Sequence, residues 1–257
     1  MVPPWVPDVP EDGNGDQAVS PDAPAPPPGP APIAPPARFG GARRSLGSFA
    51  RTGDRSDMRR GLGHYVRSGY GGAGTTTRRF AGTARTAGAL DAALAGAAGR
   101  QTVPGSPLDP VLLEGRSAEQ VMNAIVEAVR PIDGSQDTES ARVAIRDSLA
   151  ELLTRFPEAD LLNLNAEQRA FVIERFTASD VYNRFHLDVG RAIVENAPTA
   201  ATALSRLRQV KDYVKEAVAA SFRRLRDAGR ALTAGRVSQL VRDALGETFQ
   251  VFEGYAE

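Results

Sequence analysis

Residues 199–232 read TAATALSRLRQVKDYVKEAVAASFRRLRDAGRAL. Apolar side chains recur in this stretch every three or four residues, at Leu204, Leu207, Val210, Val214, Val218, Phe222 and Leu225. That spacing places them on one face of an α-helix, with charged residues on the other face. Because a helix with one apolar face must bury it against neighbours, the stretch predicts a helical bundle.

Neighbouring segments show the same pattern. Ser117-Ala118-Glu119-Gln120 and Asn165-Ala166-Glu167-Gln168 can each cap a helix start, because the first side chain accepts a free N–H and the Gln reaches back. We expect helices after both caps, another over about 137–156 and a last one over 237–252, with a break near Ser179. No period-two stretch is long enough to argue for a strand, so the predicted fold class is all-α.

Residues 38–100 are rich in arginine, glycine and alanine. Apolar residues at helical spacing predict short amphipathic helices broken by Gly53 and Gly69, then one longer helix over 75–98. Gly88, Ala92 and Gly96 would leave one flank of that helix smooth enough for close packing. We therefore divide the chain into a tail (1–37), a helical segment (38–100), a linker (101–116) with three prolines, and a bundle (117–257).

The tail is crowded with proline, which fixes φ and removes a backbone donor. With few apolar side chains to bury, residues 1–37 are predicted to be disordered. The exception is the apolar hexad Val2-Pro3-Pro4-Trp5-Val6-Pro7. We interpret Trp5, the only tryptophan, as an anchor for a partner's pocket. The alternative is a solvated chain end without a role.

Composition excludes several classes of function. The chain has no cysteine, which excludes disulfides, thiol catalysis and thiolate metal sites. It has no apolar run long enough for a membrane span and no signal-peptide pattern, so the expected location is the cytoplasm. The net charge of zero hides an asymmetry. Five acids and no base lie in 1–37, whereas twelve arginines and three aspartates lie in 38–100, a pattern typical of an interaction segment.

The basic segment supplies the candidate binding residues. They are predicted to contact phosphates or an acidic partner and comprise Arg43, Arg44, His64, Tyr65, Arg67, Arg78 and Arg79. Arginine binds phosphate, and aromatic rings stack on bases, so residues 38–85 are a candidate nucleic-acid-binding module. Alternatively, the aromatic residues form a small core and the arginines meet an acidic protein.

Residues 69–74 (GYGGAG) match the glycine pattern of dinucleotide-binding loops. The context argues against that function, since no strand precedes the loop. The remaining readings are a phosphate site at a helix start and a flexible joint. His186 has no supporting motif and is expected to be structural. The sequence therefore predicts no catalytic residues, no metal and no cofactor.

The sequence as a whole resembles the QatB family of the bacterial Qat anti-phage defence system. The resemblance rests on a Pro-Pro-Trp start, on "ARFGGARRSLGSFARTG" (37–53) and "RRGLGHYVRSGYGG" (59–72), and on the Ala/Gly-rich helix followed by a bundle. It implies a defence complex with an ATPase, a QueC-like protein and a TatD-like nuclease as partners. It also implies that catalysis belongs to those partners, and that this chain is an adaptor whose tail is a ligand or substrate of the QueC-like protein.

Overall fold

The computed structural model describes residues 37–99, 101, 103, 105–230 and 235–256. All regular structure in these ranges is helical, which confirms the all-α prediction. The prediction of a disordered tail lies outside the described residues except at Ala37, as does the prediction that Trp5 is an anchor.

Two short helices open the part of the chain that the structure describes. Helix α1 spans Gly40–Thr52 and α2 spans Arg55–His64. Gly53 separates them with a φ of 80°, a left-handed conformation that glycine adopts without strain. Helix α2 passes directly into the π-helical turn η1, Tyr65–Gly69. The short helices predicted to end at Gly53 and Gly69 are therefore confirmed.

The prediction of one helix over 75–98 was wrong at Phe80. Helix α3 covers Ala73–Arg79 and α4 covers Ala81–Ala98, and between them Phe80 has a φ of −90° and a ψ of 14°. The Phe80 ring is fully buried against Phe249, with 5.0 Å between ring centroids, and under the guanidinium of Arg184. The turn at Phe80 thus coincides with packing of its ring against two other helices. The Ala- and Gly-rich composition of the segment does not reveal this packing.

The second half of the chain contains the helices expected from the apolar stripes. Helix α5 is a single turn inside the predicted linker, and both predicted capping boxes are present, at the starts of α6 and α8. The elements are α5 Pro110–Leu113, α6 Ala118–Val129, α7 Gln136–Arg155, α8 Ala166–Phe185, η2 His186–Gly190, α9 Arg191–Asn196, α10 Ala200–Asp227, α11 Val237–Glu253 and η3 Gly254–Ala256.

The predicted break near Ser179 was wrong in position. Helix α8 continues through Ser179, which is fully buried, and the irregularity falls later, at the π-helical turn η2. A π-turn inserts a residue into the helical repeat without ending the helix, and such turns are frequent at functional sites. The turn η2 borders both hollows described below.

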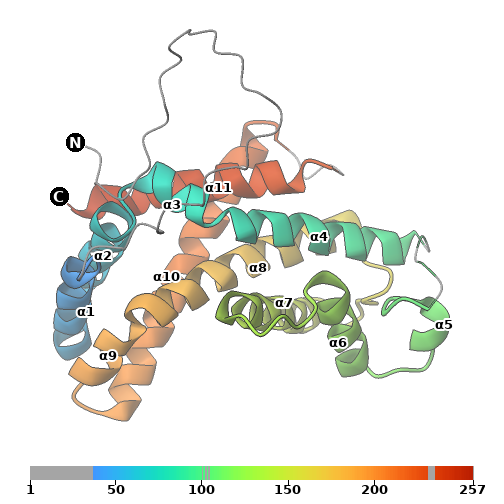
Figure 1. The fold of residues 1–257 in the computed structure, drawn as a ribbon, viewed down its shortest axis with the longest axis horizontal. Helices are drawn as coiled ribbons and strands as arrows, with labels where there is room; N and C mark the ends of the chain where they lie inside the picture. The colour runs from blue at the N-terminus through green and yellow to red at the C-terminus, as the bar shows by residue number, and fades with distance from the viewer. Residues whose placement is uncertain (1–36, 100, 102, 104, 231–234, 257) are drawn as a thin grey trace, which may run out of the picture. The chain divides into compact units, whose positions relative to one another are not determined.

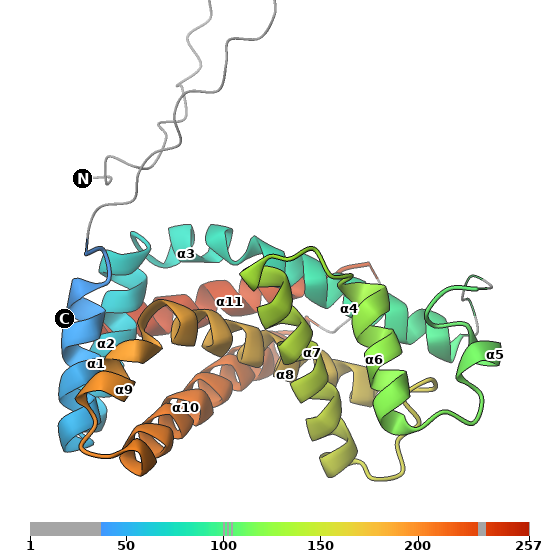
Figure 2. The same ribbon diagram turned by 60° about the horizontal axis from the view of Figure 1, so that its bottom comes forward.

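Residues Phe39–Glu257 form one compact unit with a single hydrophobic core. Figures 1 and 2 show α1, α2 and α9 together at one end of this unit and α5 and α6 at the other, with α8, α10 and α11 between them. Aromatic rings in contact join the N-terminal helices to the later ones. Tyr65 contacts Phe39 and Phe185, with ring centroids 5.4 and 5.1 Å apart.

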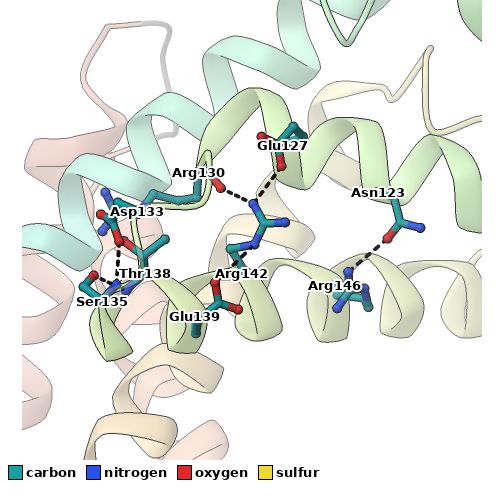
Figure 3. Close-up of polar contacts among 9 residues, drawn as sticks. All are labelled: Asn123, Glu127, Arg130, Asp133, Ser135, Thr138, Glu139, Arg142 and Arg146. Carbon is teal, nitrogen blue, oxygen red and sulfur yellow. Dashed lines mark hydrogen bonds and ion pairs between the residues drawn. The ribbon is translucent and has the colours of Figure 1, made fainter.

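Helices α6 and α7 are tied together by polar contacts on their exposed sides (Figure 3). Arg142 binds the Glu127 carboxylate at 3.0 Å and the backbone carbonyl of Arg130, while Arg146 donates to Asn123 at 3.0 Å. In the connecting loop, Asp133 accepts the Ser135 N–H at 2.9 Å and the Thr138 hydroxyl at 2.7 Å.

Asp133 makes the start of α7 sensitive to acid. Hydrogen bonds, first from the Thr138 hydroxyl and then from Ser135, lower its pKa from 3.8 to about 2. Because the carboxylate is favoured in the folded state, its stabilising contribution is complete above pH 3.8 and is lost as the pH falls through about 2.

We expect Asp133→Asn to lower the free energy of unfolding at neutral pH and to remove part of its decline between about pH 4 and pH 2. Urea unfolding at several pH values measures both effects. Glu158→Gln is the control, because Glu158 is exposed and no hydrogen bond of its side chain is seen with the described residues. Equal pH profiles for the two variants would contradict the assignment.

Candidate functional site

A pocket of about 730 Å³ lies between α1 and the segment formed by η2 and α9. Its charged lining comes from two segments that lie far apart in the sequence. Arg43, Arg44 and Arg51 belong to α1, and Asp188, Arg191 and Glu195 belong to η2 and α9. We call this hollow the basic pocket.

Gly47 allows α1 and α9 to come this close. The residue is buried, and a Cβ added to it would lie 3.1 Å from the Asn196 side chain. Asn196 is held by its own amide, which donates to the Ala192 carbonyl at 2.9 Å, and by Arg51, which donates to its Oδ1 at 2.6 Å. A small residue at position 47 thus sets the distance between α1 and α9, the helices that carry the arginines of the pocket.

The positive charge of the α1 arginines is not neutralised by carboxylates among the described residues. Arg43 donates to the backbone carbonyl of Asp188 at 3.1 Å, and Arg51 donates to an amide oxygen. Arg44 makes no hydrogen bond or ion pair with any residue that the structure describes. Only Arg191 has a carboxylate partner, Glu195 at 2.6 Å, and that pair is exposed.

Asp188 is held in the pocket wall by two hydrogen bonds. Its Oδ2 accepts hydrogen bonds from the hydroxyls of Tyr65 and Tyr70, at 2.9 and 2.7 Å. Tyr65 is fully buried, and burial raises its pKa well above 10.0, so the hydroxyl stays protonated as a donor. Two donors from the η1 region therefore hold one carboxylate of η2 in place.

His64, Arg44 and Arg67 extend the basic surface beside the pocket. Burial lowers the pKa of His64 below 6.5, and the charges of Arg60, Arg44 and Arg67 lower it further. His64 is therefore mainly neutral at neutral pH, because burial and the nearby positive charges both disfavour its protonated form. The cluster shows that these three predicted residues are brought near one another.

The other predicted residues are placed differently. Tyr65 is inside the core, so its ring is not presented at the surface, in keeping with the alternative that the aromatics form a core. Arg78 and Arg79 are exposed on α3, which lends no residue to the basic pocket. Arg78 donates to Thr75 at 2.9 Å.

The glycine-rich loop 69–74 is closed by the protein's own side chains. Gly69 lies against the Phe39 ring, where an added Cβ would be 2.4 Å from Cε1. The Ala73 N–H at the start of α3 donates to the Glu253 carboxylate at 3.0 Å. An acid from α11 thus occupies the position in which a phosphate would be bound.

Sequence reasoning missed the contribution of Asp188, Arg191 and Asn196 to the pocket. Their positions beside α1 follow from contacts between residues 145 apart in the chain, and no local pattern signals them. The five-residue turn η2 also leaves no clear mark in the apolar spacing.

A second, apolar hollow of about 340 Å³ adjoins the first. Leu187 lines both, and Val143, Asn183 and His186 contribute to the second. We call it the apolar groove. His186 stacks on Tyr182 with 5.9 Å between ring centroids, and burial lowers its pKa, so it is mainly neutral there at neutral pH.

The fold and these hollows define a protein whose described residues are all-helical and form an arginine-lined pocket. The model of the QatB family, described as the Qat anti-phage system associated protein QatB, matches residues 71–252. The chain therefore belongs to the QatB family of the Qat anti-phage system. Searches of the curated proteins and of the solved structures found no match to it. None of the described helices is long and apolar enough to cross a membrane, and the described residues include no group of three or more potential metal ligands.

The tyrosine–aspartate contact predicts that Asp188 contributes more to the free energy of unfolding than Glu195, the other acid of the pocket wall. We expect Asp188→Ala to lower the free energy of unfolding by about 1–3 kcal/mol, because it leaves the buried Tyr65 hydroxyl without its acceptor. Glu195→Ala, which removes an exposed ion pair, should change it by less than about 0.5 kcal/mol. Chemical denaturation measures both, and equal small losses would contradict the role given to Asp188.

Proposed function

We propose that this chain is a non-catalytic adaptor of the Qat defence assembly. The observation that carries the proposal is the family match over residues 71–252. The pocket supports it, because its α1 arginines have no carboxylate partner among the described residues. The polar groups of the pocket wall have structural roles. Asp188 holds two tyrosines and Asn196 holds Arg51, an arrangement that suits recognition more than proton transfer.

The partners of the adaptor are an ATPase, a QueC-like protein and a TatD-like nuclease. This part of the proposal follows from the resemblance to the family and from the system named in the family's description. Arginine-rich surfaces fit protein partners because the planar guanidinium binds carboxylates through two hydrogen bonds.

Co-expression of the tagged chain with these three proteins should yield a complex that survives size-exclusion chromatography. The three partners expressed without the chain are the control. If they assemble equally well without it, the adaptor role is contradicted.

The tail is the second part of the proposal. Residues 1–37 carry five acids, no base and the only tryptophan, and they serve as a ligand or substrate of the QueC-like partner. An extended, proline-rich segment can enter a narrow active site, whereas a folded helix cannot.

We expect a chain lacking residues 1–37 to keep its helix content and thermal unfolding but to lose protection in a phage plaque assay. Trp5→Ala in the full chain separates the anchor from the rest of the tail. Full protection by the shortened chain would exclude this role.

Nucleic-acid binding is the alternative function, and the uncompensated charge of Arg43 and Arg44 favours it. Under this alternative, binding to DNA or RNA is micromolar or tighter at low salt. For each tenfold rise in salt concentration, the binding constant falls by about one logarithmic unit per phosphate contact. Arg43→Ala with Arg44→Ala should then weaken binding more than Arg78→Ala with Arg79→Ala, because only the first pair lines the pocket. Binding that neither pair alters would exclude the pocket as a nucleic-acid site.

A further inference from the structure

The basic pocket and the apolar groove adjoin one another. They meet at Leu187, a residue of η2 that is 53% exposed and lines both hollows. On the groove side lies Val143 of α7, which is 45% exposed. Large aliphatic side chains at the surface of a hollow gain stability when a ligand covers them.

Three arginines of α1 line the pocket beside this groove. Elsewhere in the described part of the chain, several arginines have a carboxylate partner, whereas Arg146 and Arg242 donate to amide oxygens. The paired arginines include Arg142 with Glu127, Arg169 with Asp91, Arg175 with Glu151, Arg184 with Asp180, Arg224 with Glu247 and Arg230 with Asp243. Arg43 and Arg51 instead bond to neutral oxygen atoms, and Arg44 has no direct partner among the described residues. The pocket therefore attracts an anionic group from outside.

We propose that these two hollows dock an acidic segment of a partner protein, with its carboxylates in the basic pocket and an apolar side chain in the groove. The inference rests on the proposed adaptor function and names the surface that performs it. A carboxylate matches the guanidinium groups of Arg43, Arg44 and Arg51 in geometry and charge. Leu187 and Val143 supply the contact that selects for a neighbouring apolar residue.

The same observations favour a protein over a nucleic acid. Besides polar residues such as Glu139 and Asn183, the groove is lined by Val143, Leu187 and a neutral histidine, which offer little surface for base stacking compared with an aromatic platform.

Site-specific photo-crosslinking in the assembled complex tests the docking surface. Leu187→p-benzoylphenylalanine in the full chain, mixed with the ATPase, the QueC-like protein and the TatD-like nuclease, should crosslink to one segment of one partner. Mass spectrometry of the crosslinked peptide should show acidic residues next to an apolar one. The control is Leu204→p-benzoylphenylalanine, because Leu204 is 65% exposed but lines neither hollow.

Charge reversal tests the basic pocket in the same experiment. Arg43→Glu with Arg44→Glu should reduce the Leu187 crosslink at least tenfold, while Arg85→Glu, an exposed arginine of α4 outside both hollows, should leave it unchanged. Circular dichroism and thermal unfolding establish that each variant is folded.

The outcomes separate the two proposals. A complex that assembles without a Leu187 crosslink, or with one that charge reversal does not alter, overturns the docking surface and leaves the adaptor role intact. A crosslink to nucleic acid overturns it in favour of the alternative function. If the unaltered chain forms no complex at all, the adaptor role fails and the docking surface fails with it.

Discussion

The packing of aromatic rings around Tyr65 and Phe80 is the interaction on which the rest of the structure depends. Tyr65 stacks on Phe39 and meets Phe185 of α8, and Phe80 meets Tyr70 and Phe249 of α11. These rings connect the glycine-rich N-terminal helices to two of the strongly apolar later ones. Because glycine weakens α1 and α2 as isolated helices, burial against this cluster provides the stability that local propensity lacks.

The same cluster fixes the geometry of the basic pocket. Tyr65 and Tyr70 reach from the core to the carboxylate of Asp188, which belongs to the π-turn η2, and the backbone of Asp188 in turn accepts the Arg43 guanidinium. A buried hydrophobic contact is thus linked through two hydroxyl groups to a charged surface. A pocket built in this way is preorganised, so a ligand need not pay for ordering its walls.

Charge along the chain and charge on the surface are distributed differently. The arginines concentrated in residues 38–100 do not act as one basic stretch once the chain is folded. Arg43, Arg44 and Arg51 line the pocket, Arg59 lies over the rings of Tyr213 and Tyr255, and Arg78 and Arg79 lie on α3. Folding therefore brings a few arginines together at one pocket and gives others structural contacts.

The sequence by itself determined the later helices and several of the helix ends, because apolar spacing and capping residues act within a few positions of one another. The capping boxes at Ser117 and Asn165 and the stop at Gly53 are examples. The interruption at Phe80 and the turn η2 were decided by tertiary packing. Tertiary packing also places the Glu253 carboxylate at the glycine-rich loop and decides which arginines line the pocket. Those features depend on contacts between residues 104 to 180 positions apart, and local patterns carry no record of such contacts.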